Sequence, residues 1–190
     1  MKIYLARHGE TDWNAQRRLQ GRIDISLNET GRRQAGELAS NLQAIRLDAI
    51  YCSALKRSIE TAELVGRKPL IILPELNEQA LGKYEGMQLE GEALVEFQKR
   101  RSNVEDTLDG GESRSEHRNR IRTALSRIRH AHSGETQVLI IGHGGTNSVI
   151  LKELFDLQTD LMFSIGNSDL FLIDLPATGK PTLWKYLTIQ

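Results

Sequence analysis

The sequence contains very little cysteine, proline or aromatic residue. Its 190 residues include one cysteine, Cys52, four prolines and 5% aromatic residues. A single thiol cannot form an internal disulfide, and no second cysteine stands at a metal-binding or redox spacing. These absences argue against a disulfide-stabilised secreted domain and lead us to expect a cytoplasmic protein.

Net charge and long hydrophobic runs are also missing. The chain has 25 basic and 25 acidic residues, so no global field would hold a nucleic acid, which we do not expect as a partner. The longest apolar runs, such as VLIIG at 138–142, fall far short of the roughly 20 residues of a membrane span. The apolar run at 3–6 is too short for a signal peptide. We expect a soluble protein that makes no membrane contact.

The pattern of apolar residues predicts alternating strands and helices in a single domain over residues 1–190. Apolar runs predict strands, and apolar residues at helical spacing predict helices. Strands are expected at 2–6, 47–53, 70–73 and 137–142, helices at 30–45, 55–67, 92–101, 116–132 and 144–157, a loop at 75–89, and two edge strands at 169–175 and 182–189. This alternation predicts an α/β fold, a three-layer α/β/α sandwich with a mostly parallel central sheet, whose ligands gather at the carboxyl ends of the strands.

Two of the predicted strands end in a histidine. Arg7 and His8 follow the first strand, His143 follows the strand at 137–142, and Arg57 lies in the first turns of a helix after the same edge. Guanidinium groups match phosphate oxygens bidentately, so Arg7 and Arg57 are suited to grip a tetrahedral dianion. Their charge disfavours protonation of His8, which keeps the imidazole nucleophilic. His143 would supply a further donor.

A leaving alkoxide also needs a proton. A carboxylic acid in a partly apolar loop keeps its proton to higher pH, and Glu78 in PELNEQALGKYEG is the best-placed candidate by its order along the chain. Glu10, Asp12 and Glu85 are competitors that spacing alone does not rank.

Six segments together carry a resemblance to a known family. In chain order they are LARHGETDWN, GRIDISLNETGRRQA, YCSALKRSIETA, LNEQALGKYEG, GGES and IIGHGG. They resemble the motifs of the histidine phosphatase superfamily, also called phosphoglycerate mutase-like, and the resemblance spans nearly the whole chain. DISL lacks the usual proline, Tyr84 replaces a usual tryptophan and Glu60 replaces a frequent glutamine; none of these departures removes a catalytic group.

The resemblance implies a phosphoglycerate mutase-like fold and a phosphomonoester hydrolase that forms a phosphohistidine intermediate on a small phosphorylated metabolite. It implies that His8 is the phosphorylated nucleophile and that Glu78 is the proton donor. The phosphoryl group would be bound by Arg7, Arg57 and His143, the pocket lined by Asn14, Gln20, Gly21 and Ser26, and a backbone amide offered by Gly144. No metal or organic cofactor is implied, the expected partner is a small-molecule phosphomonoester, and a homodimer is left open.

Three other functions were weighed against this one. A phosphoglycerate-type mutase is disfavoured because the segment 86–110 is too short for the usual lid and substrate-carboxylate contacts. A non-catalytic phosphoprotein-binding module ranks last because every catalytic position is intact. A histidine metal site is disfavoured because two neighbouring arginines would repel a cation.

Several charged residues have no assigned role at this point. Glu10 either orients His8 or faces solvent, and Arg17, Arg18 and Arg22 would be able to meet a second anionic group of the substrate. The six arginines at 114–129 are interpreted as a solvated helix face, with a docking surface for an anionic partner as the alternative. His117 and His132 fall on the apolar face of the same helix and are interpreted as satisfied core or boundary histidines.

Overall fold

A six-stranded sheet forms the centre of the molecule. The computed structural model describes residues 1–66, 69–132, 134–159, 163, 165–167 and 169–187. The strands follow the order β3-β2-β4-β1-β5-β6 across the sheet. Their bounds are β1 Lys2–Arg7, β2 Ala49–Cys52, β3 Leu70–Ile72, β4 Gln137–Gly142, β5 Leu170–Asp174 and β6 Thr182–Leu187. β3, β2, β4 and β1 run parallel, whereas β5 is antiparallel to both β1 and β6, so the predicted mostly parallel sheet is confirmed.

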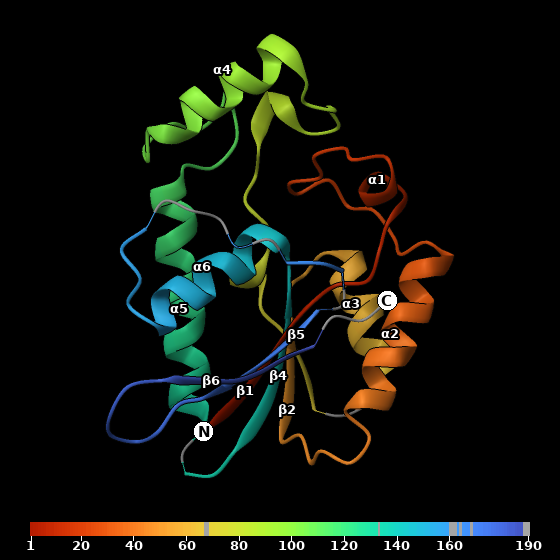
Figure 1. Cartoon of the computed structure of the whole chain (residues 1–190), viewed down its shortest axis with the longest axis vertical. Coiled ribbons are helices and arrows are strands. Elements are labelled where there is room, and N and C mark those ends of the chain that lie inside the picture. The colour runs from red at the N-terminus through yellow and green to blue at the C-terminus, as the bar shows by residue number, and fades with distance from the viewer. Residues whose placement is uncertain (67–68, 133, 160–162, 164, 168, 188–190) are drawn as a thin grey trace.

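Helices cover both faces of this sheet, which confirms the three-layer architecture. α2 (Glu29–Asn41) and α3 (Lys56–Val65) pack on one face, and α5 (Arg114–Ala131) and α6 (Gly144–Leu154) pack on the other. Figure 1 shows α1 (Asp12–Ala15) and α4 (Gly91–Ser102) beyond the carboxyl ends of the parallel strands. None of the helices in the described part of the chain has the length and apolarity that a bilayer crossing needs.

The two cores explain why the strands are continuous apolar runs. In β1, Ile3 and Leu5 pack toward α5 and α6, whereas Tyr4 and Ala6 pack toward α2 and α3, and all four side chains are buried. A strand covered on both faces by helices has no polar side, and this is typical of parallel sheets. The first polar side chains therefore come only where the strand ends, at Arg7 and His8.

Three details differ from the sequence prediction. The short helix α1 was not predicted; it begins at a capping box in which Thr11 and Asn14 satisfy each other's backbone N–H groups. β5 lies inside the sheet between β1 and β6, so only β6 is an edge strand at this end. The loop expected at 75–89 contains two single turns of 3-10 helix, Pro74–Leu76 and Gly82–Tyr84. Arg67, Thr188 and Ile189, the ends of two predicted elements, lie outside the described residues.

A small separate cluster supports the segment above the sheet edge. Tyr84 is 1% exposed and packs edge-to-face against Phe97 of α4 with ring centroids 4.9 Å apart, and its hydroxyl donates to Glu96. Arg100 of α4 pairs with Asp106 and Asp109 in the following loop. Tyr84 thus holds α4 in place.

We predict that two glycines of α2 respond oppositely to alanine. A Cβ on Gly31 would lie 2.0 Å from the backbone oxygen of Glu10, whereas a Cβ on Gly36 meets no atom within 4 Å. Gly31→Ala should lower the free energy of unfolding by about 2 to 3 kcal/mol, because backbone must move. Gly36→Ala should raise it by about 1 kcal/mol, because alanine favours helix. Urea unfolding of both variants is the measurement, and equal effects would contradict the close packing at Gly31.

Candidate active site

The two predicted histidines meet at the carboxyl edge of the sheet. β1 and β4 are adjacent and parallel, with Arg7 paired to Gly142, and the N–H of His8 donates to the carbonyl of Gly142 at 3.1 Å. The residues that follow in each strand therefore lie side by side. The imidazole rings of His8 and His143 have centroids 5.0 Å apart, and both side chains are buried.

His8 is held in the form that a nucleophile requires. Its Nδ1 lies 2.7 Å from the carbonyl oxygen of Gly9, so Nδ1 carries the hydrogen and Nε2 carries the lone pair. No described residue forms a hydrogen bond with Nε2. Burial, followed by the charges of Arg57 and Arg7, lowers the pKa of His8 well below its ordinary value. The imidazole is therefore neutral at physiological pH, as the sequence argument required.

Arg57 is fixed from behind by backbone carbonyls. It is 1% exposed, and its Nη1 and Nη2 donate to the carbonyl oxygens of Ile23 and Gly21, each at 2.8 Å. Its Nε donates to Nδ1 of His143 at 3.3 Å. Burial lowers the pKa of Arg57 to about 10, so the guanidinium stays charged at neutral pH. Each Nη still has a second hydrogen to offer a ligand.

Arg7 provides the second positive charge. Its Nη1 donates to the carbonyl oxygen of Ile165, and its Nε is buried without a hydrogen-bond partner among the described residues. Burial lowers the pKa of this side chain. An orphaned buried donor is costly, and one beside a cavity points to a ligand that satisfies it.

His143 differs from the expectation in its orientation. Its Nδ1 accepts from Arg57, so the hydrogen is on Nε2, which donates to Oγ of Ser53 at 2.8 Å. Burial and the charge of Arg57 lower the pKa of His143 well below its ordinary value. As it stands, this ring supports Arg57 and does not present a free N–H to the cavity.

A cavity of about 350 Å³ lies over these groups. Eight of the ten sequence-predicted site residues line it: Arg7, His8, Asn14, Gln20, Gly21, Arg57, Glu78 and Gly144. His143 lies behind the wall. Ser26 does not line the cavity and is exposed; from this segment it is the backbone carbonyls of Gly21 and Ile23 that reach the site, where they accept from Arg57. The placement expected for Ser26 is thus corrected.

Glu78 binds the N-terminus of α6. Its Oε2 accepts from the N–H of Gly145 at 2.8 Å, and its Oε1 accepts from the N–H groups of Thr146 and Gln79 at 3.0 and 2.9 Å. A Cβ on Gly145 would lie 2.7 Å from Oε1, so only glycine allows this approach. The sequence argument did not single out Gly145; its signal was the second glycine of GHGG.

The protonation of Glu78 corrects the sequence argument, which expected a carboxylic acid that keeps its proton. Burial favours the neutral form, but His117 when charged, the N–H groups of Gln79 and Gly145, and Arg57 outweigh it and lower the pKa of Glu78. Burial lowers the pKa of His117 to about 4, so at neutral pH the groups that still favour the carboxylate of Glu78 are the N–H groups of Gln79 and Gly145 and the charge of Arg57. Without a bound anion, Glu78 is therefore ionised.

Arg120 holds the loop that presents Glu78, and sequence reasoning assigned it only to a solvated face. Its guanidinium donates to the backbone carbonyls of Glu75, Asn77 and Glu78 at 2.7, 2.6 and 3.0 Å. It also forms a bidentate pair with Glu112 of the GGES segment, at 2.6 and 2.7 Å. Helical periodicity placed Arg120 on a polar face but carried no signal of what that face contacts.

Two of the three competing carboxylates have structural roles. Glu10 accepts from Nδ2 of Asn28 at 2.9 Å, so it ties the loop after β1 to the start of α2 and does not orient His8. Glu85 accepts from the N–H groups of Arg22 and Leu81 at 2.8 and 3.0 Å, which makes it a loop-capping carboxylate. Asp12 is exposed in the first turn of α1.

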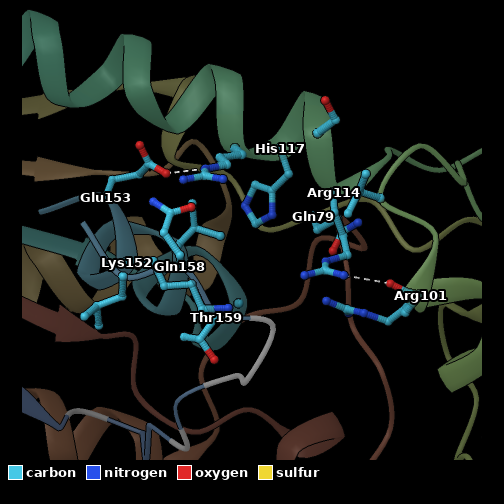
Figure 2. A pocket seen from close by; sticks show the side chains of 14 residues that line it. Gln79, Arg101, Arg114, His117, Lys152, Glu153, Gln158 and Thr159 are labelled. Carbon is cyan, nitrogen blue, oxygen red and sulfur yellow. Dashed lines mark hydrogen bonds and ion pairs between the residues drawn. The ribbon is translucent and has the colours of Figure 1, made fainter. Parts of the chain in front are cut away.

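A second cavity of about 370 Å³ lies beside the first, between α5 and α6 (Figure 2). The two cavities share Gln79, Arg101 and Gly145 in their walls. His117 lines the second cavity, is 2% exposed and contacts Oγ1 of Thr146 through Nε2 at 3.1 Å. It is a satisfied buried histidine, as predicted. In the described part of the chain, no three histidine, cysteine or carboxylate side chains come together as metal ligands.

Comparison with known proteins identifies the family. The model of the histidine phosphatase superfamily (branch 1) matches residues 3–183. Phosphoglycerate mutase-like protein 4 of Arabidopsis thaliana is 35% identical, over 82% of this chain and 70% of its own. The metal-independent phosphoserine phosphatase of Arabidopsis thaliana is 37% identical, over 76% and 64%. The structure of mycobacterial glucosyl-3-phosphoglycerate phosphatase with VO3 superposes with a TM-score of 0.84 at 26% identity, covering 96% of each chain.

The buried histidine His117 predicts a loss of stability in mild acid. Its pKa is about 4 in the folded protein and about 6.5 when unfolded, so both states are uncharged above pH 6.5. As the pH falls, His117 binds a proton in the unfolded chain before it does so in the folded protein. The free energy of unfolding therefore decreases by about 2 kcal/mol between pH 7 and pH 5. His117→Gln should reduce the pH 7 to pH 5 loss by that amount in urea unfolding. His130→Gln, an exposed position on the same helix, should leave the loss unchanged; equal losses in all three proteins would contradict the assignment.

Proposed function

The chain belongs to the histidine phosphatase superfamily, and we propose that it hydrolyses small phosphomonoesters through a phosphohistidine formed on His8. The observation that carries this proposal is a neutral imidazole whose Nε2 has no hydrogen-bond partner among the described residues and which feels the charges of two buried guanidinium groups. Its relatives are phosphatases and phosphoglycerate mutase-like proteins, which makes the chain a hydrolase of phosphorylated substrates.

In the first half of the reaction, Nε2 of His8 attacks phosphorus and the bond to the ester oxygen breaks. Arg7 and Arg57 donate to the equatorial oxygens, where charge must be stabilised in the transition state. The departing alkoxide takes a proton from Glu78, and the alcohol leaves. The hydrogen bond from the N–H of Gly145 holds the carboxyl group of Glu78 in the wall of the cavity, beside the phosphoryl site.

Binding of the substrate would itself favour protonation of Glu78, which must be protonated to act as the donor. A phosphate dianion in the cavity opposes the negative carboxylate and partly neutralises the arginines that lower its pKa. The pKa of Glu78 would therefore rise when substrate binds. The ionised state of Glu78 in the empty site is compatible with a proton-donating role in the complex.

In the second half, water attacks the phosphorus of the phosphohistidine. Glu78 accepts a proton from this water, the bond between phosphorus and Nε2 breaks, and inorganic phosphate leaves. His8 returns to its neutral form and Glu78 has regained the proton it gave, so no metal ion or external acid is required.

The entrance of the cavity favours a substrate with a second anionic group. Arg17, Arg18 and Arg101 line it in addition to Arg7 and Arg57, and Glu78 is the only acidic side chain among the described lining residues. The guanidinium of Arg101 forms no ion pair with a described residue, although burial lowers its pKa. A carboxylate or a second phosphate on the substrate would compensate this charge. Homodimerisation, a cytoplasmic location and the single domain over residues 1–190 stay predictions.

The phosphohistidine mechanism predicts complete dependence on His8. His8→Ala should lower kcat on p-nitrophenyl phosphate by at least about a thousandfold, because no nucleophile remains. A chelator should leave the wild-type rate unchanged. Acid-labile, alkali-stable radiolabelled phosphate should be trapped on the wild type and not on His8→Ala.

The matched control is His130→Ala, which removes an exposed histidine outside the site. Undiminished turnover by His8→Ala, or complete loss on chelation, would exclude the mechanism. Rapid conversion of 3-phosphoglycerate to 2-phosphoglycerate without free phosphate would show a mutase instead.

The charge of Arg101 predicts a substrate preference. The ratio of kcat/KM for phosphoserine to that for the carboxylate-free ester phosphoethanolamine should exceed one in the wild type. Arg101→Met should lower that ratio about tenfold or more, because the loss of a charge-assisted hydrogen bond costs about 1.5 to 3 kcal/mol. Arg129→Met, an exposed change on α5, serves as control. An unchanged ratio in Arg101→Met would refute the role of Arg101 in selecting anionic substrates.

A further inference from the structure

The two oxygens of Glu78 have unequal surroundings. Oε1 accepts from three donors, namely the N–H groups of Gln79 and Thr146 and the hydroxyl of Thr146 at 3.1 Å. Among the described residues, Oε2 accepts from the N–H of Gly145 alone. A proton on the carboxyl group therefore goes to Oε2, because its second lone pair is open while Oε1 is saturated.

The hydroxyl of Thr146 has one hydrogen and two possible acceptors. Its Oγ1 lies 3.1 Å from Oε1 of Glu78 and 3.0 Å from the carbonyl oxygen of Asn77. When Glu78 is ionised, the carboxylate is the stronger acceptor and the hydroxyl donates to it. When Glu78 is protonated, the hydroxyl turns to Asn77, and no heavy atom has to move.

His117 fixes this hydroxyl from the opposite side. Its Nε2 lies 3.1 Å from Oγ1 of Thr146. Because the single hydroxyl hydrogen is committed to Glu78 or Asn77, Nε2 must carry a hydrogen and donate it to Oγ1. The histidine is thus a constant donor that keeps Oγ1 in place, whichever acceptor the hydroxyl chooses.

Neither residue of this pair reaches the phosphoryl site. Thr146 is fully buried, and His117 lies at the wall of the second cavity, pointing in from α5 (Figure 2). Neither is among the described residues that line the phosphoryl cavity. A substitution at either position therefore changes Glu78 without removing a contact to the phosphoryl group.

We propose that Thr146 and His117 are a positioning pair for the proton-donating Glu78: the hydroxyl donates to Oε1 while Glu78 is ionised, and it turns to Asn77 when the transferable proton is on Oε2. The inference rests on the proposed role of Glu78. The hydroxyl stabilises the carboxylate while the site is empty and releases it when substrate binds, so the pair adjusts the acidity of Glu78 to the state of the site.

The charged groups around the pair are few. Those that face Glu78 are Arg7 from β1, Arg57 from α3, Arg101 from the end of α4 and His117 from α5. Those that face His117 are Glu78, Arg120, Glu112 and Arg101. Removal of the neutral hydroxyl leaves all of these charges in place, so its effect on the pH profile is separable from theirs.

The test measures leaving-group release in the first turnover as a function of pH. An alkyl phosphate needs a proton on its leaving oxygen, whereas p-nitrophenyl phosphate does not. With the alkyl ester, Thr146→Val should move the alkaline limb of the first-turnover rate up by about one pH unit, because the carboxylate loses one hydrogen bond. Thr146→Ser, which keeps the hydroxyl, should overlay the wild type.

His117→Leu should move the same limb in the same direction, and the double variant should move it no further than Thr146→Val alone, because His117 acts through the hydroxyl. KM should stay within about twofold of the wild type in every variant. The p-nitrophenyl phosphate profile should not shift, and its first-turnover rate reports that each variant is folded. Three results would refute the positioning role. They are an alkaline limb that does not move in Thr146→Val, a shift in Thr146→Ser equal to that in Thr146→Val, and shifts that add in the double variant.

Glu78→Gln separates failure of this inference from failure of the proposed function. If Glu78→Gln releases the alkyl alcohol as fast as the wild type, Glu78 is not the proton donor, and the positioning role of Thr146 and His117 is refuted as well. If Glu78→Gln is slow on the alkyl ester alone while the limb of Thr146→Val stays in place, only the pair is refuted.

Discussion

Positive charge held at the carboxyl edge of the sheet without a direct ion pair is the constraint on which the rest of the site depends. Arg7 and Arg57 are both buried enough that their pKa values are lowered, yet neither forms an ion pair with a described residue. Their hydrogen bonds go to backbone carbonyls of Ile165, Gly21 and Ile23, which bind the cations without cancelling their charge. The two guanidinium groups are therefore desolvated already in the folded protein, and a phosphate dianion that binds there interacts with them without further loss of their hydration.

The N-terminus of α6 is used in a way that follows from this charge. Helix N-termini commonly bind anions, and here the N–H groups of Gly145 and Thr146 bind the carboxylate of Glu78. The same contacts keep Glu78 ionised in the empty site and place it beside the cavity. Arg120 holds the preceding backbone, so the position of the carboxylate depends on α5 as well as on α6. Arg120, which was predicted to lie on a solvated helix face, thus positions the backbone that carries Glu78.

Much of the fold was predictable because local patterns were unambiguous. Doubly covered strands appear as continuous apolar runs, and the polar residues that follow them mark the sheet edge, so the placement of His8 and His143 at that edge was predictable. Their contact depends on the pairing of β1 with β4, which the sequence did not give. Four residues of α1 were missed because so short a helix has no periodicity. β5 was placed wrongly at an edge because pairing partners depend on the whole sheet. Ser26 was expected in the pocket, but its segment contributes the carbonyls of Gly21 and Ile23 and not this side chain.

By itself, the sequence determined which chemical groups this protein has and the order in which the strands deliver them. Arginine beside histidine after an apolar strand already implied a neutral imidazole and a phosphate-binding charge. Only the tertiary structure decided the ionisation of Glu78, the orientation of His143 and the contact between His117 and Thr146. These depend on hydrogen bonds between residues 67 or 68, 86 and 29 positions apart in the chain. Such contacts arise when helices pack on a common sheet, and no local pattern encodes them.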